Sequence, residues 1–309
     1  MKECLYTKRL KSDRVVCSLC CNQCLISPGG RGLCRVRENN KGRLYSLNYQ
    51  KYFEEADKPV ESLNLYNFMP GIKVFCIRSV GNNLRYPKKE EDIEKVLSKM
   101  KKAPSDQLVR KALKSGCRAV AFTGEEPFVF FEGMIEVARL ARAKKLKVIV
   151  RTNGYAYEKP LKDLFKYADA FIFSLPSCDR DAFLKLAGGK LSQVQKNIKE
   201  TAESGAWVEI DTVIIPGLND NERELRKIAE FIALLNPLMP WHISGIAGHE
   251  TESSIRRMAC ELGLKFVYLG SCSTMCPKCG KEVIKRSVFE VHIKDGKCGF
   301  CRAKLGGIF

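Results

Sequence analysis

The sequence lacks the features that would direct the chain out of the cell or into a membrane. No apolar segment of the signal-peptide type follows Met1-Lys2-Glu3. No apolar run approaches the length that a bilayer-spanning helix requires. The basic segments also lack interleaved aromatic residues or an evident recognition helix, so they match no nucleic-acid-binding motif. We therefore expect a cytoplasmic protein with no membrane partner.

The chain nevertheless carries a formal net charge of +18. The basic residues gather in four segments: Arg31–Arg43, Lys88–Lys102, Arg139–Arg151 and Lys278–Arg286. Such a surface attracts phosphates, nucleic acid or an acidic partner protein. A lysine-rich solvated surface, typical of heat-adapted proteins, accounts for the same composition. A nucleic-acid partner therefore stays open.

The 309 residues include fifteen cysteines, several of them in Cys-x-x-Cys pairs. In a small secreted protein this number would indicate disulfides, but in a large unexported chain such pairs indicate metal binding. Two pairs lie near the end of the sequence, Cys276/Cys279 and Cys298/Cys301. Two knuckles of this kind supply the four thiolates of a closed structural zinc site. We predict a zinc ribbon over residues 271–309, with a hairpin formed by Val283–Arg286 and Val288–Ile293.

Residues 71–270 alternate short apolar runs with amphipathic stretches, which is typical of repeated β-α units around a parallel sheet. The predicted strands are Ile72–Val80, Arg118–Thr123, Lys147–Thr152, Ala170–Leu175, Trp207–Ile215 and Trp241–Ser244, with an extra strand at Lys265–Leu269. Helical spacing of apolar residues runs from Ile93 to Met100 and from Leu225 to Leu235. Residues 1–70 look irregular and cysteine-rich.

The loop after the first predicted strand reads Gly81-Asn82-Asn83-Leu84-Arg85-Tyr86-Pro87-Lys88-Lys89. It resembles the cluster loop, Gly-Cys-Asn-Leu-Arg-Cys-Pro-x-Cys, of radical S-adenosylmethionine (SAM) enzymes of the AmmeMemoRadiSam and pyruvate-formate-lyase-activase-like type. In that family the three thiolates hold a [4Fe–4S] cluster. Here Asn82, Tyr86 and Lys89 stand in the cysteine positions, and none of them offers the thiolate that such a cluster needs.

The resemblance covers nearly the whole chain. It implies an α/β fold, a partial (β/α)6 radical SAM-type barrel over residues 71–270 with a cysteine-rich extension over residues 1–70 and the zinc ribbon at the end. Cys17, Cys20, Cys24 and Cys34 stand at positions that the family extension uses. Together they predict a second metal site, which could hold zinc or an iron–sulfur cluster.

Cys21 adds an alternative to this second site. Cys17, Cys21 and Cys24 reproduce the Cys-x3-Cys-x2-Cys spacing of the superfamily's triplet. The family's own triplet follows the first barrel strand, whereas this one lies upstream of it. We therefore prefer the set of Cys17, Cys20, Cys24 and Cys34, and keep the Cys17/Cys21/Cys24 cluster as an alternative that would leave an active enzyme.

Active sites of β/α barrels lie at the carboxyl ends of the strands. By resemblance, a SAM pocket is formed by Glu126, Pro127, Thr152, Asn153, Pro216 and Gly217. Glu126 would meet the amino group of SAM, or it could be an exposed surface glutamate. Pro216 and Gly217 have an alternative role, in which they form a turn that reverses the chain and do not contact SAM. Asn219 or Asp220 would then cap the next helix.

Departures from the family pattern concentrate at the same strand ends. Ser174-Leu175-Pro176 replaces Asp-Leu-Lys, and after Trp241-His242-Ile243-Ser244 the expected arginine and histidine are missing. We therefore predict a degenerate radical SAM protein that acts as a scaffold for SAM, a nucleotide or a protein partner, with His242 packing rather than reacting. The partners that the resemblance implies are an active homologue or Memo-like and AMMECR-like proteins. A basic, nucleic-acid-binding zinc-ribbon protein is the remaining alternative.

Overall fold

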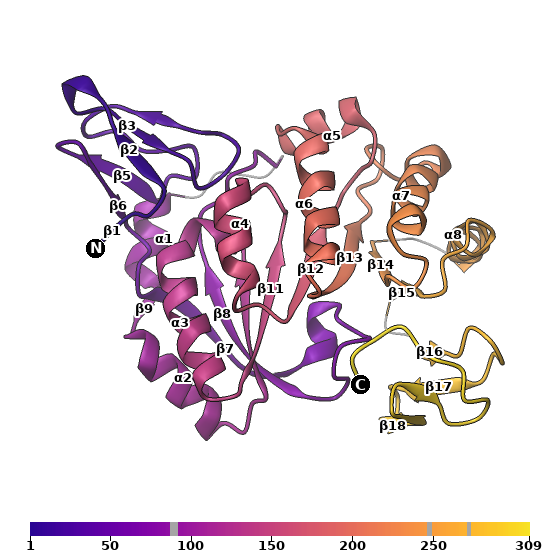
Figure 1. Cartoon of the computed structure of the whole chain (residues 1–309). Helices are drawn as coiled ribbons and strands as arrows, with labels where there is room; N and C mark the ends of the chain where they lie inside the picture. Colours follow the sequence, from indigo (N-terminus) through magenta and orange to yellow (C-terminus); the bar gives the residue numbers. More distant parts are fainter. Residues whose placement is uncertain (87–91, 246–248, 271–272) are drawn as a thin grey trace. The chain divides into compact units, whose positions relative to one another are not determined.

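The computed structural model describes residues 1–86, 92–245, 249–270 and 273–309, and they form two compact units. The first unit comprises Met1–Lys58, Lys73–Phe171 and Ala187–Ala206; the second comprises Pro59–Ile72, Ile172–Leu186 and Trp207–Phe309. The chain passes between the units more than once, and one passage lies within strand β12 (Ala170–Ser174). Figure 1 follows the course of the chain from end to end. The division into residues 1–70, 71–270 and 271–309 stays a prediction.

Parallel strands form the centre of the first unit. Strand β10 (Ala119–Gly124) pairs in parallel with β8 (Lys73–Ser79) on one side and with β11 (Lys147–Thr152) on the other. In β8, Val74 to Ile77 are all buried, as expected of a parallel strand covered on both faces. Strands β7 (Lys51–Pro59) and β9 (Lys101–Lys102) continue the order β11-β10-β8-β7-β9.

Helices α2 (Ser105–Lys114) and α3 (Phe131–Ala143) pack against these strands (Figure 1). The other helices of this unit are α1 (Ile93–Lys99), α4 (Glu158–Phe165), α6 (Leu191–Glu203) and the short 3-10 helices η1 (Lys11–Asp13) and η3 (Pro127–Phe130). The predicted helix at Ile93 is confirmed, and Asp92 caps it by accepting from the backbone N–H groups of Glu94 and Lys95.

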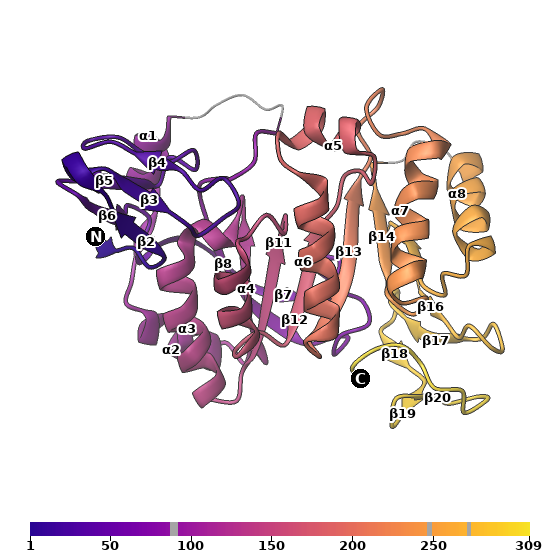
Figure 2. The same cartoon turned by 45° about the horizontal axis from the view of Figure 1, so that its top comes forward.

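The prediction that residues 1–70 are irregular is wrong in part. Two three-stranded sheets lie side by side here (Figure 2), with the orders β1-β6-β5 and β2-β3-β4. Their strands are β1 (Lys2–Glu3), β2 (Thr7–Arg9), β3 (Val15–Cys17), β4 (Leu25–Ile26), β5 (Arg37–Asn40) and β6 (Arg43–Ser46). Strands of two to four residues are too short to show the alternation by which a strand is found in a sequence.

The second unit has its own parallel strands, in the order β15-β14-β13. Its elements are η2 (Val60–Leu63), α5 (Arg180–Ala187), β13 (Trp207–Val213), α7 (Glu222–Leu235), β14 (Trp241–Ser244), α8 (His249–Glu261) and β15 (Val267–Leu269). Helix α7 is capped by Asn221, which accepts from the N–H of Glu224. The prediction that Asn219 or Asp220 caps this helix is therefore wrong.

The chain ends in short antiparallel strands that carry the four C-terminal cysteines. They are β16 (Thr274–Met275), β17 (Glu282–Lys285), β18 (Glu290–Val291), β19 (Ile293–Lys294) and β20 (Lys297–Cys298). The predicted hairpin is confirmed at β17 and β18, but its second arm is shorter than expected because β19 pairs with β20 instead.

The α/β class with parallel strands is confirmed. The six predicted strands and the extra one at Lys265–Leu269 correspond to β8 and β10 to β15. Among the helices that the structure describes, none combines the length and the apolar character that crossing a bilayer requires.

A buried ion pair ties the N-terminal sheets to helix α3 within the first unit. Both side chains are almost fully excluded from solvent, and Arg37 donates from Nη2 to the two carboxylate oxygens of Glu132 at 2.7 and 2.6 Å. The same carboxylate accepts from the backbone N–H of Leu5 at 2.9 Å. Arg37 also donates from Nη1 to the carbonyl of Leu5 and to the sulfur of Cys17. Because both charges are removed from water, each depends on the other and on these hydrogen bonds.

Glu132→Gln should therefore lower the free energy of unfolding by about 3–5 kcal/mol, because it leaves the Arg37 guanidinium buried without a counter-charge. Urea unfolding measures the change. Glu222→Gln is the matched control, because Glu222 makes an exposed pair with Arg226 whose loss should cost no more than about 1 kcal/mol. Equal effects of the two substitutions would contradict this role of the pair.

Candidate functional site

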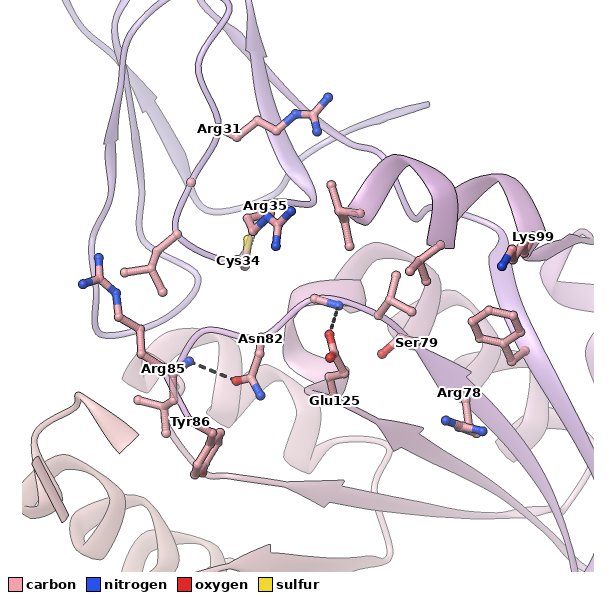
Figure 3. Close-up of a pocket in the computed structure, with 18 residues that line it drawn as sticks. Arg31, Cys34, Arg35, Arg78, Ser79, Asn82, Arg85, Tyr86, Lys99 and Glu125 are labelled. Carbon is pink, nitrogen blue, oxygen red and sulfur yellow. Dashed lines mark hydrogen bonds between the residues drawn. The ribbon is translucent and has the colours of Figure 1, made fainter. Parts of the chain in front are cut away.

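The loop that follows β8 is held by side-chain amides and a carboxylate. The backbone N–H of Gly81 donates to Oε2 of Glu125 at 2.7 Å, and Figure 3 shows this bond at the edge of a cavity. Asn82 turns its Oδ1 back to accept from the N–H of Leu84 at 3.0 Å. Gly81 has a φ of +98°, and a Cβ there would lie 2.8 Å from the side chain of Val36, so only glycine fits.

Asn83 is the central residue of this loop and is almost completely buried. Its Nδ2 donates to the carbonyl of Tyr155 at 3.0 Å, and its Oδ1 accepts from Nδ2 of Asn153 at 2.8 Å. Its own carbonyl accepts from Nδ2 of Asn22 at 2.6 Å. One residue thereby joins the loop after β8, the loop after β11 and the N-terminal segment.

The residues in the cysteine positions do not fit a [4Fe–4S] cluster. The amide of Asn82 is engaged with Leu84 and also accepts from Asn153 at 3.3 Å. Tyr86 is half-buried, and its removal from solvent raises the pKa of its phenol far above the ordinary value. Lys89 lies outside the described residues. An amide and a protonated phenol offer no thiolate to iron.

Glu126 is fully buried, so the alternative that it is an exposed surface glutamate is wrong. Its Oε1 accepts from the backbone N–H of Phe128 at 2.9 Å and from Oγ1 of Thr152 at 2.8 Å. Its Oε2 accepts from the N–H of Asn153 at 2.8 Å. Burial raises the pKa of this carboxyl from 4.5 to about 7, although the three hydrogen bonds act in the opposite direction.

Four of the six predicted SAM-pocket residues therefore lie together in the first unit: Glu126, Pro127, Thr152 and Asn153. Pro216 and Gly217 belong to the second unit, in a turn that Asn219 closes by accepting from the N–H of Ile215 at 2.6 Å. Asn219 also donates to the carbonyls of Pro176 and Val213. That these six residues share one ligand stays a prediction.

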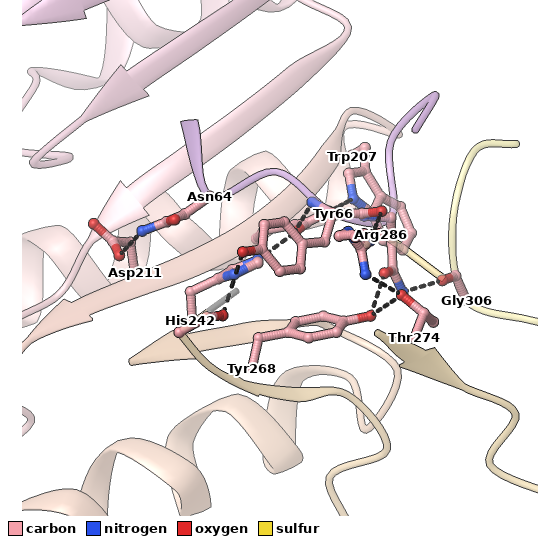
Figure 4. A network of polar contacts seen from close by, with 12 residues as sticks. Asn64, Tyr66, Trp207, Asp211, His242, Tyr268, Thr274, Arg286 and Gly306 are labelled. Atoms are coloured by element: carbon pink, nitrogen blue, oxygen red, sulfur yellow. Dashed lines mark hydrogen bonds and ion pairs between the residues drawn. The ribbon is translucent and has the colours of Figure 1, made fainter. Parts of the chain in front are cut away.

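His242 is buried and packs as predicted (Figure 4). Its ring stacks on Tyr268 at 5.0 Å and meets Tyr66 edge-on at 4.6 Å. Its Nε2 lies 2.5 Å from Oε2 of Glu209, and Glu209 also accepts from the backbone N–H groups of Tyr66 and Asn67. A histidine enclosed in this way serves the packing of the second unit.

This network continues to the C-terminal strands inside the second unit. The guanidinium of Arg286 lies 4.1 Å from the centre of the Tyr66 ring and donates to the carbonyl of that residue at 3.0 Å. It also donates to Oγ1 of Thr274 at 3.0 Å. The sequence prediction missed Glu209 and Arg286, although a glutamate inside an apolar run such as Trp207–Ile215 is a signal for a buried partner.

The four C-terminal cysteines come together as a candidate metal centre. Their sulfur atoms all lie within 4.8 Å of one another. Cys276 lies 3.6 Å from Cys301 and Cys279 lies 3.8 Å from Cys298, sulfur to sulfur. A small cluster of buried apolar residues, including Val283 and Leu305, packs around them. The prediction of a four-cysteine metal site in this segment is confirmed.

The N-terminal cysteines are gathered less tightly. Among the described residues, no second group of three or more potential ligands lies within 4.8 Å. Burial is the main cause that raises the pKa of the Cys20 thiol. Cys34, Cys17 and Cys24 lie near enough to Cys20 to contribute to the same rise. The N–H of Leu33 donates to the sulfur of Cys24 at 3.5 Å. The second metal site stays a prediction.

Cys21 is directed away from this group. Its thiol donates to the carbonyl of Ala156 at 3.0 Å. Burial raises the pKa of the thiol to about 12, so that it stays protonated at neutral pH and can act as a donor.

Comparison with known families matches residues 74–232 to the radical SAM superfamily. The match covers more than half of the chain, and the protein belongs to this superfamily. An uncharacterized protein of Methanocaldococcus jannaschii, MJ0808, is 29% identical over 99% of both chains. The narrower resemblance to the AmmeMemoRadiSam type stays a prediction.

Other relatives match a smaller part. The trans-4-hydroxy-L-proline dehydratase activating enzyme of Clostridioides difficile is 31% identical over 35% of this chain and 38% of its own length. The pyruvate formate-lyase-activating enzyme of Clostridium pasteurianum is 26% identical over 42% of this chain and 57% of its own. Among solved structures, SuiB of Streptococcus suis has a TM-score of 0.51 at 15% identity, covering 69% of this chain and 52% of its own. It supports the fold alone.

The buried Glu126 should make the stability of the protein depend on pH. Its carboxyl has a pKa of about 7 in the folded protein and 4.5 ordinarily, so folding favours the neutral form. This contribution is fully present below pH 4.5 and is lost as the pH rises through 7. Between pH 5 and pH 8 the free energy of unfolding of the native protein, measured with urea, should fall by about 1–3 kcal/mol more than that of the Glu126→Gln variant.

The exposed Glu203 provides the matched control, Glu203→Gln. If the free energies of unfolding of the native protein and of Glu126→Gln change in parallel from pH 5 to pH 8, the raised pKa of Glu126 is contradicted.

Proposed function

We propose that this member of the radical SAM superfamily does not cleave SAM reductively at the usual loop, and that it acts as a scaffold for a ligand or a protein partner. The observation that carries the proposal is the loop after β8. Asn82 and Tyr86 occupy two of the three thiolate positions, and the amide of Asn82 is bonded to the backbone of the loop. A reaction that begins with electron transfer from a cluster needs thiolate ligands there.

The surrounding contacts support a stable loop rather than an incomplete one. Asn83 fixes its middle, Glu125 binds its first N–H group, and the N–H of Arg85 donates to the carbonyl of Ala187 at 2.8 Å. All of these residues lie in the first unit. The loop is therefore held by hydrogen bonds in a protein that has no metal ligand at Asn82 or Tyr86.

The C-terminal metal centre is proposed to bind zinc in a structural role. A tetrahedral site with bonds of about 2.3 Å places its sulfurs about 3.8 Å apart, and two of the sulfur pairs here lie 3.6 and 3.8 Å apart. The segment around it buries only a few apolar residues, so the metal would supply much of its folding free energy. The N-terminal set Cys17, Cys20, Cys24 and Cys34 is proposed as a second site for zinc or an iron–sulfur cluster.

A protein partner is part of the proposal. Several relatives are named as activating enzymes of another enzyme, and the net charge of +18 favours an acidic partner surface. The family resemblance points to an active homologue or to Memo-like and AMMECR-like proteins. SAM itself, held near Glu126, is the remaining ligand of the scaffold.

The test compares the native protein with the variant N82C/Y86C/K89C, which restores the three thiolates to an otherwise unchanged loop. Both are reconstituted anaerobically with iron and sulfide, reduced and incubated with SAM. The variant should bind about four more iron atoms per chain than the native protein, because a [4Fe–4S] cluster adds four. The native protein should form no 5′-deoxyadenosine.

Formation of 5′-deoxyadenosine by the native protein would contradict the proposal. In that case Cys21→Pro identifies the cluster. Loss of iron and of product in that variant would locate an active cluster on Cys17, Cys21 and Cys24.

A further inference from the structure

A cavity of about 690 Å³ lies beside the loop, entirely within the first unit (Figure 3). Four parts of the chain enclose it: the segment 31–35, the ends of β7 and β8 with the loop 81–86, helix α1, and Glu125. Cavities of this size accommodate small molecules of the size of a nucleotide. Asn82 and Tyr86, which stand where the superfamily carries thiolates, are among the lining residues.

The lining is strongly cationic. Five of its residues are basic, namely Arg31, Arg35, Arg78, Arg85 and Lys99, against one acidic residue, Glu125. Two carboxylates outside the lining, Glu38 and Glu94, pair with Arg31. Within the lining itself the basic residues therefore outnumber the acidic one, and the oxygen Oε2 of Glu125 is engaged by the N–H of Gly81.

The cations come from separate parts of the sequence. Arg31 and Arg35 belong to the first of the four basic segments, and Lys99 belongs to the second. Arg78 is on β8 and Arg85 is on the loop. The fold thus brings two basic segments to one concave surface. A surface that merely keeps a protein soluble does not require such convergence, whereas an anion site does.

One wall of the cavity is apolar. Val80 and Ile93 are buried there, and Phe53 and Val96 pack partly buried against the same cluster. A ligand that fits both parts carries a multiply charged group beside an apolar or aromatic group. Arginine is suited to the charged part, because its planar guanidinium binds phosphate oxygens in pairs.

We propose that this cavity binds a small organic phosphate of the nucleoside diphosphate class. The phosphates lie among the arginines, and the base or another flat group lies against Phe53 and Val96. This ligand class extends the proposed scaffold function. It rests on that function in one respect: a loop without thiolates holds no cluster, so the cavity beside it can hold another ligand. A nucleic acid would need a row of stacking platforms, and the lining holds two aromatic residues, Phe53 and Tyr86.

The experiment is titration calorimetry of the purified full chain with ADP, inorganic pyrophosphate and adenosine. ADP should bind most tightly, pyrophosphate more weakly, and adenosine weakest, because only ADP uses both parts of the cavity. Arg35→Ala and Arg85→Ala should each weaken ADP binding on the order of tenfold, the loss expected for a charge-assisted hydrogen bond. Arg35→Lys should fall between Arg35→Ala and the native protein, because lysine keeps the charge without the paired donors.

Lys95→Ala is the matched control. Lys95 is on the same helix as Lys99 but pairs with Asp92 and does not line the cavity, so this variant should bind ADP as the native protein does. Absence of ADP and pyrophosphate binding at millimolar concentration would overturn the proposal. So would equal affinities in the Arg35→Ala and Lys95→Ala variants, or binding of a single-stranded RNA that ADP does not displace.

Failure of this proposal is distinguishable from failure of the proposed function. Iron content and 5′-deoxyadenosine formation report on the loop, whereas the heat of ADP binding reports on the arginines. A native protein that cleaves SAM but binds ADP would contradict the proposed function and support the anion site. One that neither cleaves SAM nor binds ADP would support the proposed function alone.

Discussion

The hydrogen bonds of Asn83 are the constraint on which the rest of the candidate site depends. This buried amide joins the loop after β8 to the loop after β11 through Asn153, and to the N-terminal segment through Asn22. In active members of the superfamily the three thiolates also attach this loop to a cluster. Here hydrogen bonds from polar side chains and one backbone bond, from Arg85 to Ala187, hold it, and each such bond contributes only about 1 kcal/mol net. Several of them converging on one buried residue give the loop a single conformation.

Buried ionisable side chains hold elements together elsewhere in each unit. In the first unit, Arg37 and Glu132 connect the N-terminal sheets to helix α3. In the second, Glu209 connects strand β13 to His242 and to the backbone of Tyr66 and Asn67. These buried residues serve the fold, whereas the arginines that line the cavity beside the loop are the ones proposed to bind a ligand.

Local patterns in the sequence predicted much of the fold but less of the site. The apolar runs predicted β8 and β10 to β15, because buried parallel strands appear in a sequence as nearly continuous apolar runs. The paired cysteines gave the C-terminal metal centre, because four thiolates at that spacing can meet. The N-terminal strands were missed because they are two to four residues long. The convergence of Arg35, Arg78 and Lys99 could not be predicted, because it depends on long-range folding that no spacing encodes.

The central claim is that the superfamily's fold is kept here without its cluster at the loop after β8. The most direct measurement is the metal content of the full chain purified under anaerobic conditions, with iron and zinc determined per chain in the native protein and in Cys20→Ser. The account predicts zinc at the C-terminal cysteines, and any iron present should depend on Cys20. Iron that persists at a full cluster's stoichiometry in Cys20→Ser, together with SAM cleavage, would contradict it.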